Sequence, residues 1–308
     1  MKEIKVHAPA TVSNVVCGFD CLGFAINEPF DEMTVRLTDE KKVSIRHLDE
    51  YNLPTDAQAN VAGAALLAML ENIEENVGFE VEIKKNIKPG SGIGSSAASA
   101  VGAVAAANML LDERFSRAEL AEFALAGEFV ASRGRHADNV APALFGGFVL
   151  IRSVTPLDVV ELDFPKLFAT VIHPQIEVKT SYAREILPKN VPLKDAVNQW
   201  SNVGALIAAL AKGDYQLLAR SLEDFIVEPV RKNLIPHFDE LKAESLKAGA
   251  LGGGISGSGP SVFMLSETAE TAKKIAAAMR EIYSPTGIDF HVYVSEVNRE
   301  GVRKADNG

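Results

Sequence analysis

Cysteine is nearly absent from this sequence of 308 residues, which contains only Cys17 and Cys21. Two cysteines are too few for the disulfide framework that stabilises small secreted domains. They stand four residues apart with no second pair, so the spacing of a zinc site is lacking as well. We therefore expect both to be small packing residues.

Long hydrophobic runs are also missing from the chain. No stretch reaches the ~18 apolar residues that a membrane-spanning helix needs. The first residues, Met1 to Val6, lack the basic and then apolar pattern of a secretory signal. The sequence therefore predicts a cytoplasmic protein with no membrane partner.

Positive charge is in short supply, because Lys and Arg number 31 against 41 for Asp and Glu, a formal net charge of -10. Proteins that bind nucleic acids or anionic membranes need a surplus of cations. Trp200 is the only tryptophan, and the five tyrosines form no stacking pattern. We expect no nucleic-acid partner, although a local basic pocket for a phosphate or a carboxylate is still allowed.

The overall composition is that of a globular protein, with 47% hydrophobic and 23% charged residues. Apolar alternation predicts strands and 3.6-residue spacing predicts helices, the clearest helices covering 60–70, 95–111 and 116–131. Ser116 and Glu119 form a capping-box pattern at the start of the third helix. Strands separated by helices favour an α+β fold. Turn-like residues around 153–165 suggest domains 1–158 and 159–308, and the polar tail after Val297 is expected to be loose.

The most informative stretch is Pro89–Ser99, in which three glycines alternate with other residues and two serines follow. It connects a predicted strand to a predicted helix. Glycines allow a sharp turn, and the first turn of a helix presents free N–H groups and a positive dipole end. This combination favours an anion, most naturally a nucleotide phosphate. A plain strand-to-helix connection would need one serine and one glycine, and neither a Walker loop nor a dinucleotide fingerprint is present.

Four ordered segments of the chain resemble motifs of the GHMP kinases, and in particular those of the homoserine branch of that family. They are Ala8–Asn14 with Gly18–Gly23, Pro89–Ser99, His136–Pro142 with Gly146 and Gly147, and Gly252–Ser261. The resemblance spans nearly the whole chain. One departure is Val15–Cys17, where the family usually has Leu-Gly-Pro.

The resemblance implies a fold with an N-terminal, nucleotide-binding domain like ribosomal protein S5 domain 2 and a C-terminal ferredoxin-like α/β sandwich. It implies ATP and Mg²⁺ as cofactors, with the metal held by Ser96 and Glu128. Asn60 would lie near the nucleotide base, although an N-cap is a nearly equal alternative. For Glu128 the alternative is the solvated face of a helix. The implied phosphate cradle comprises Pro89, Gly90, Ser91, Gly92, Ile93, Gly94, Ser95, Ser96, Ala97, Ala98 and Ser99.

The implied acceptor is L-homoserine, a zwitterion with a terminal hydroxyl. By resemblance Asp20, with Asn14 beside it, would bind the ammonium group. Arg184 and Arg231, with Thr180 nearby, would bind the carboxylate, since Arg forms bidentate pairs with that group. For any single arginine the alternative is a surface ion pair of little energetic value.

Asn139 stands where related kinases carry a catalytic aspartate, and an amide cannot take a proton at neutral pH. The resemblance therefore implies direct attack by the hydroxyl, with Asn139 and His136 orienting it. Asp138 is the rival candidate for a general base. Adjacent side chains usually point in different directions, so we expect Asp138 to be structural.

Taken together, the resemblance implies ATP-dependent phosphorylation of the homoserine hydroxyl, and it allows a homodimer. Two alternatives stay open. One is a kinase of the same family that acts on another small alcohol. The other is a nucleotide-binding regulator without turnover.

Overall fold

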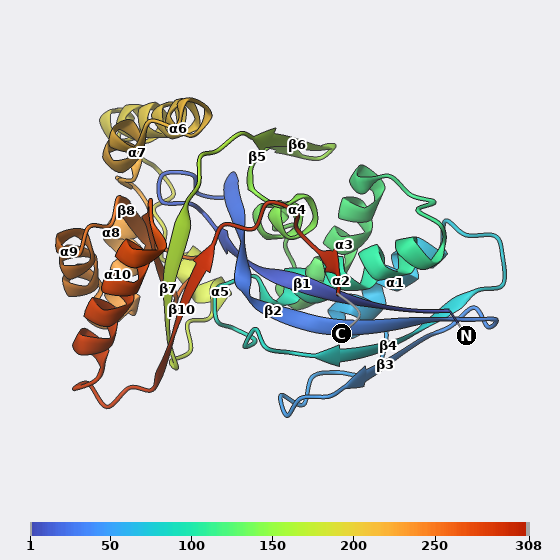
Figure 1. The fold of residues 1–308 in the computed structure, drawn as a ribbon. Helices are drawn as coiled ribbons and strands as arrows, with labels where there is room; N and C mark the ends of the chain where they lie inside the picture. Colours follow the sequence, from blue (N-terminus) through green and yellow to red (C-terminus); the bar gives the residue numbers. More distant parts are fainter. Residues whose placement is uncertain (1, 306–308) are drawn as a thin grey trace.

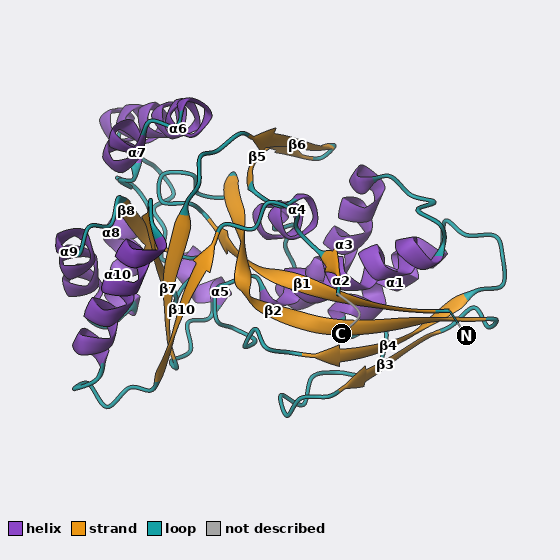
Figure 2. Cartoon of the chain, in the orientation of Figure 1, coloured by secondary structure: helices purple, strands orange, loops and turns teal. Residues whose placement is uncertain are grey.

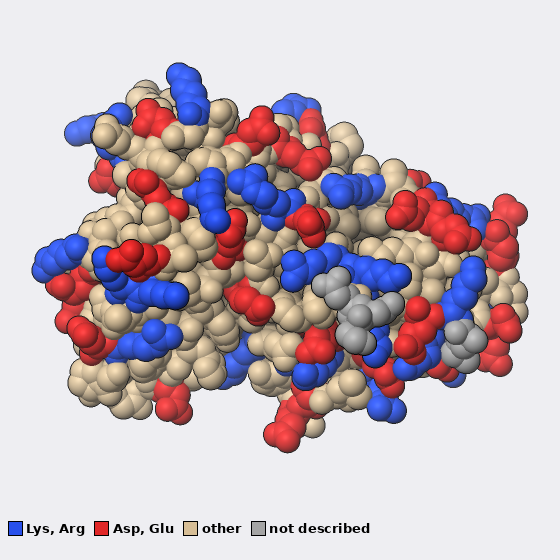
Figure 3. All heavy atoms as spheres, in the orientation of Figure 1, with Lys and Arg blue, Asp and Glu red and all other residues tan. Residues whose placement is uncertain are grey.

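The computed structural model describes residues 2–305, apart from the side chain of Ser132, and arranges them as two sheets that carry helices (Figures 1 and 2). This arrangement confirms the predicted α+β class. Figure 3 shows acidic and basic side chains interspersed over one face of the molecule. Among the described residues, no helix is both long enough and apolar enough to cross a bilayer.

The first sheet has seven strands in the order β11-β1-β2-β4-β3, with β5 paired to β2 and β6 paired to β5. All neighbours are antiparallel except β3 and β4. Alternate residues such as Val6, Ala8, Met33 and Val35 are buried, as the apolar alternation predicts. The strands are β1 (Glu3–Ser13), β2 (Leu22–Thr38), β3 (Val43–His47), β4 (Gly78–Lys84), β5 (Phe148–Val154), β6 (Leu157–Leu162) and β11 (Arg303–Lys304).

Four helices accompany this sheet: α1 (Val61–Leu70), α2 (Ser95–Leu110), α3 (Arg117–Ser132) and α4 (Ala137–Phe145). The central one, α2, is buried at every residue except Ser96 and Met109. Its small side chains allow this close packing, since a Cβ added at Gly102 would lie 2.4 Å from the sulfur of Met33. The alanine-rich stretch is therefore a core helix, and its partly exposed residue near the start, Ser96, lines the cavity of the site.

The helix starts follow the predicted capping chemistry. Asn60 caps α1, with its Oδ1 accepting hydrogen bonds from the backbone N–H groups of Ala62 and Gly63. Ser116 caps α3, and Ser116 and Glu119 form both bonds of the capping box. These caps fix the starts of two helices that reach the site, α1 with its capped start at Asn60 and α3 with its last turns at Glu128.

The second sheet has four antiparallel strands in the order β10-β7-β9-β8. In chain order, strand, helices, two strands, helix and strand give the β-α-β-β-α-β pattern of a ferredoxin-like sandwich. The strands are β7 (Phe168–Pro174), β8 (Gly252–Ile255), β9 (Val262–Ser266) and β10 (Phe290–Glu296). The helices are α5 (Thr180–Glu185), α6 (Leu193–Lys212), α7 (Tyr215–Ser221), α8 (Glu228–Arg231), α9 (Phe238–Lys247) and α10 (Ala269–Tyr283), with a 3₁₀ turn at Lys232–Leu234.

Residues at both ends of the expected second domain, 159–308, belong to the first sheet. The expected division between 158 and 159 falls inside β6, which pairs with β5, so the chain leaves the first sheet after Leu162. The expectation of a loose tail after Val297 was wrong, because Val297 and Asn298 are buried and β11 pairs with β1. Residues 306–308 of that tail lie outside the described residues.

Candidate active site

A cavity of about 730 Å³ lies where the two halves of the chain meet, and both halves line it. Its volume is within the roughly 300–1,000 Å³ usual for ligand sites. The predicted site residues that line it are Asn14, Asp20, Asn60, Pro89, Gly90, Gly92, Gly94, Ser95, Ser96, Ser99, Glu128, His136, Asn139, Thr180, Arg184 and Arg231. Four predicted cradle residues, Ser91, Ile93, Ala97 and Ala98, are instead buried behind its wall.

The loop before α2 turns on three glycines with left-handed backbone, with φ of 77° at Gly90, 79° at Gly92 and 71° at Gly94. Two of them have no room for a side chain. A Cβ at Gly94 would lie 1.9 Å from Thr11 Oγ1, and one at Gly92 would lie 2.6 Å from the carbonyl oxygen of Gly259. The N–H groups of the first turn of α2 have no partner within the helix, so the loop and the helix end together favour an anion.

The glycine-rich segment Gly252–Ser261 supports the back of this loop. Ser256 Oγ donates to the carbonyl oxygen of Gly92 at 2.7 Å, and Ser261 Oγ donates to that of Ser91 at 2.6 Å. The loop carbonyls are therefore bonded on the side away from the cavity. A second contact, from the N–H of Gly257 to the carbonyl oxygen of Ser13 at 3.2 Å, joins the same segment to the end of β1.

Lys85, which follows β4 directly, lies beneath the loop with a side chain only 2% exposed. Its Nζ donates to the Asp31 carboxylate, to the carbonyl oxygen of Ser95 at 2.7 Å and to Ser99 Oγ at 2.9 Å. The Asp31 carboxylate also accepts two backbone N–H groups at 2.9 Å. This buried pair is fully bonded, so it holds the loop and the start of α2 in place without offering free charge to the cavity.

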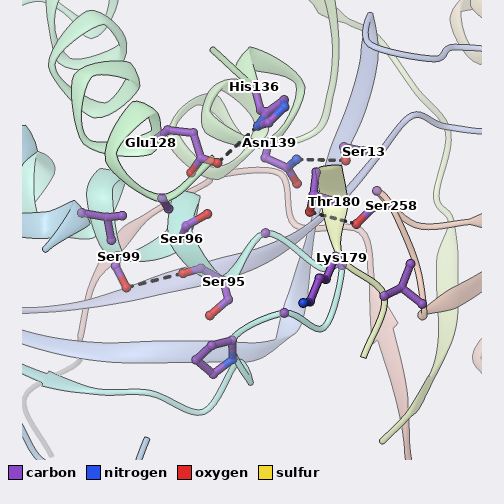
Figure 4. A pocket seen from close by; sticks show the side chains of 18 of the residues that line it. Ser13, Ser95, Ser96, Ser99, Glu128, His136, Asn139, Lys179, Thr180 and Ser258 are labelled. Atoms are coloured by element: carbon purple, nitrogen blue, oxygen red, sulfur yellow. Dashed lines mark hydrogen bonds and ion pairs between the residues drawn. The ribbon is translucent and has the colours of Figure 1, made fainter. Parts of the chain in front are cut away.

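Ser96 and Glu128 face the same part of the cavity (Figure 4). Glu128 is only 4% exposed, which excludes the alternative that it lies on a solvated helix face. A hydroxyl and a carboxylate are hard oxygen donors, and Mg²⁺ commonly takes only one or two protein ligands and completes its shell with phosphates and water. Over residues 2–305 no cluster of three or more His, Cys, Asp or Glu suited to a metal occurs. The donor set thus fits Mg²⁺ shared with a substrate phosphate.

Asn139 is held in a fixed orientation at the edge of the loop (Figure 4). Its Oδ1 accepts from Thr11 Oγ1 at 2.8 Å, and its Nδ2 donates to Ser13 Oγ at 2.9 Å. The second N–H of the amide is left for a ligand. His136 lies on the same wall, 3.4 Å from Glu128 Oε1, and that contact raises the pKa of His136.

Asp138 and Asn139 both line the cavity. The expectation that adjacent side chains point in different directions therefore does not exclude Asp138 from the site. Asp138 is 4% exposed. Burial, and then the negative charge of Asp20, raises the pKa of Asp138 to about 6, although the nearby His136 opposes the shift. A buried carboxyl of this kind changes protonation in the range where proton transfer is useful.

Asp20 and Arg184, predicted to bind opposite ends of the acceptor, are paired with each other. Arg184 donates to both carboxylate oxygens of Asp20, at 2.8 and 2.9 Å. Asn14 Oδ1 accepts the Asp20 N–H, and both residues have positive φ. The unusual segment Val15–Cys17 is buried between them, with Val16 at a φ of 49°, so backbone strain is concentrated at this loop.

Arg231 is a second cation beside this pair, and it is only 3% exposed. It donates to the carbonyl oxygens of Ala183 and Gly257, at 2.7 and 3.2 Å, and lies over the ring of Phe19. Burial, and then the charge of Arg184, lowers the pKa of Arg231 to about 10, so the side chain is charged at neutral pH. In the part of the chain that the structure describes, no carboxylate is bonded to Arg231. A charged, buried arginine of this kind suits an anionic group of a ligand.

Two predicted residues have internal partners at the cavity wall. The amide of Asn60 is occupied on both sides, since its Nδ2 lies 2.7 Å from the carbonyl oxygen of Pro54 and 3.1 Å from His47 Nε2. The structure thus gives Asn60 the capping role, and its contact with a base stays a prediction. Thr180 Oγ1 lies 3.2 Å from Ser258 Oγ, which connects α5 to the glycine-rich segment.

Several residues that build the site were given no individual role from the sequence, although all but the lysine lie in the motif segments: Thr11, Ser13, Lys85, Ser256 and Ser261. The first two could have been found, because residues two apart in a strand face the same side. The lysine breaks the apolar alternation after a strand, which is a weak signal. The two serines belong to the resembling segment Gly252–Ser261, and the contact between the two halves shows which loop carbonyls they bond.

Comparisons with known proteins identify the family of this chain. The family model for the GHMP kinases N terminal domain matches residues 60–147, and that for the GHMP kinases C terminal region matches residues 206–285. A homoserine kinase of Chlorobium phaeobacteroides is 48% identical, covering 98% of this chain and 99% of the relative. One from Pyrococcus furiosus is 41% identical, covering 96% and 98%.

Solved structures give the same result. The crystal structure of homoserine kinase from Cytophaga hutchinsonii is 51% identical, with a TM-score of 0.95 over 99% of this chain and 98% of that one. The crystal structure of L. major mevalonate kinase is 18% identical with a TM-score of 0.72, which supports the fold alone. This chain belongs to the GHMP kinase family.

The role of the phosphate loop in turnover can be tested with alanine at two of its glycines. Both positions have left-handed backbone, but only one of them lacks space for a Cβ. Gly94→Ala places a Cβ against Thr11, whereas a Cβ at Gly90 meets nothing within 4 Å. We expect Gly90→Ala to cost about 1–2 kcal/mol of stability from its left-handed backbone, with turnover within a fewfold of the parent. Gly94→Ala should lose at least about a hundredfold in turnover, since it displaces the partner of Asn139. Equal losses in both variants, measured as kcat and melting temperature, would contradict this account.

The buried carboxyl of Asp138 predicts a pH-dependent stability. Its folded pKa of about 6 is above the ordinary aspartate pKa of 3.8, so the folded state binds an extra proton between these two pH values. The unfolding free energy should therefore fall as pH rises from about 4 to 6, by on the order of 3 kcal/mol at most. Asp138→Asn removes the loss of stability that comes from ionising this buried carboxyl. The variant should melt higher than the parent at pH 7.5 and close to it at pH 4.5, and a constant difference would exclude the effect.

Proposed function

We propose that this chain transfers the γ-phosphoryl group of ATP to the hydroxyl of L-homoserine and makes O-phospho-L-homoserine, an intermediate of threonine biosynthesis. One observation carries the choice of acceptor. Asp20, Arg184 and Arg231 lie together in the cavity whose other end is the phosphate loop. A cytoplasmic location and a homodimer stay predictions.

The ATP end is supported by the loop and the helix start. The triphosphate would lie against the N–H groups between Gly92 and Ser96, where the positive helix end also favours negative charge. Ser96 and Glu128 would hold Mg²⁺, which would supply positive charge to compensate that of the phosphates.

The acceptor end favours a zwitterion. Asp20 and Arg184 neutralise each other, so a ligand with one charge would separate them and leave one group unpaired. A ligand with both an ammonium and a carboxylate gives each group a new partner, and Arg231 adds a second partner for the carboxylate. A neutral sugar or an alcohol with one charge cannot make this exchange.

The reaction needs alignment more than covalent chemistry. The hydroxyl oxygen forms a bond to the γ-phosphorus, the bond from that phosphorus to the β–γ bridging oxygen breaks, and ADP leaves with that oxygen. The hydroxyl proton passes to solvent or to the phosphoryl group. Asn139, fixed by Thr11 and Ser13, and His136 would orient the hydroxyl for this attack.

The choice of acceptor can be tested by measuring ADP release with L-homoserine, 4-hydroxybutyrate and 3-amino-1-propanol. The last two lack the ammonium and the carboxylate, respectively. Each should have kcat/KM at least about thirtyfold below that of homoserine, because losing one charged partner costs roughly 2 kcal/mol or more. In Asp20→Asn, Arg184 is freed, so the preference for homoserine over 4-hydroxybutyrate should fall by at least tenfold.

The matched control is Asp163→Asn, an exposed aspartate outside the cavity. It should leave the kcat/KM ratio of homoserine to each of the two analogues unchanged. Equal rates for homoserine and either analogue in the parent protein would support another acceptor. Nucleotide binding with no ADP release on any alcohol would support the regulator.

The role of Asp138 can be decided with Asp138→Asn. If attack is direct, as we propose, the variant keeps turnover within about tenfold of the parent. A loss of most of kcat with unchanged KM, together with a loss of the rate increase near pH 6, would make Asp138 the general base.

A further inference from the structure

We propose that Lys179 contacts the phosphoryl group in transfer and is a catalytic cation of this enzyme. It would reach that group from the C-terminal half, across the cavity from the phosphate loop. The inference rests on the proposed kinase function, because it assigns a role in the same reaction.

The cationic side chains of the cavity differ in whether another group of the protein already binds them. Four Lys or Arg side chains line it: Lys85, Lys179, Arg184 and Arg231. Lys85 is buried against Asp31, and Arg184 is paired with Asp20. Arg231 is bonded to two carbonyl oxygens at the acceptor end. Within residues 2–305, Lys179 is the one of the four whose side chain has no hydrogen bond or ion pair.

The segment that carries Lys179 forms a wall of the cavity and is anchored at both ends. At its start, Lys88 Nζ donates to Gln175 Oε1 at 2.5 Å, next to the phosphate loop. At its end, Thr180 Oγ1 lies 3.2 Å from Ser258 Oγ. All five residues from 177 to 181 line the cavity. Figure 4 shows Lys179 between Thr180 and the phosphate loop.

The phosphate loop itself supplies no side-chain cation to compensate the charge of a bound triphosphate. The Pro89–Ser99 segment contains no lysine, and Lys88 just before it is bonded to Gln175. Without Lys179, backbone N–H groups and a metal would supply most of the compensation for the triphosphate charge. Beyond the Asp20–Arg184 pair, the cavity also holds the carboxylates of Glu128, Asp138 and Glu177, which add negative charge. During transfer, charge is spread over the γ-phosphoryl oxygens, and a positioned cation stabilises it. A lysine has a flexible stem and three donors suited to this contact.

The test compares Lys179→Met with Lys189→Met, an exposed lysine outside the cavity. With Mg²⁺ present, Lys179→Met should lower kcat by about a hundredfold, with KM for homoserine within threefold of the parent. Lys179→Arg should recover at least a tenth of the parent kcat. Lys189→Met should match the parent, and all variants should keep its melting temperature.

A binding measurement separates contact with the γ-phosphate from a general effect. By calorimetry with Mg²⁺, Lys179→Met should bind the β,γ-imido analogue of ATP at least fivefold more weakly than the parent, and ADP within twofold. Turnover within threefold of the parent, or equal weakening for both nucleotides, would overturn the proposal. If the parent releases no ADP with homoserine, the proposed function fails, whereas the comparison of the two nucleotides still decides the role of Lys179.

Discussion

The hydrogen bonds between the phosphate loop and the Gly252–Ser261 segment determine the geometry of the whole site. Ser256 and Ser261 bond the carbonyl oxygens of Gly92 and Ser91, which are 164 and 170 positions away in the chain. Because these carbonyls are bonded away from the cavity, the N–H groups at the other side of the loop are left for an anion. The same contact joins the phosphate loop to the half of the chain that carries Arg184 and Arg231. A hydrogen bond from the Glu28 N–H to Ser295 Oγ joins the two sheets directly.

Two ion pairs at the cavity differ in exposure. Lys85 and Asp31 form a buried pair that is bonded on all sides, which avoids the cost of an isolated buried charge. Asp20 and Arg184 form a half-exposed pair that a ligand of matching charges can replace without leaving either group alone. The difference in exposure explains the difference in role, since the first pair cannot exchange partners without disrupting the loop and the second can.

The parts of the structure that could be predicted from sequence depend on neighbours a few positions away. The caps at Asn60 and Ser116 are of this kind, and so are the glycines before α2. The exchangeable pair of Asp20 and Arg184 could not be predicted, because sequence indicates each residue's chemistry but not that the two meet. The return of β11 to β1 was missed for the same reason: a polar tail gives no sign that an edge strand has a place for it.

The amide at Asn139 fits a site where negative charge is already high. A carboxylate there would stand beside Glu128 and the triphosphate, and like charges close together raise the energy of both. The amide keeps the orienting hydrogen bonds to Thr11 and Ser13 without adding charge. Asp138, one position earlier, is buried and takes up a proton below about pH 6, which limits its own negative charge in acid. Orientation by neutral groups, with charge compensation from other segments of the chain, is therefore the arrangement that this cavity favours.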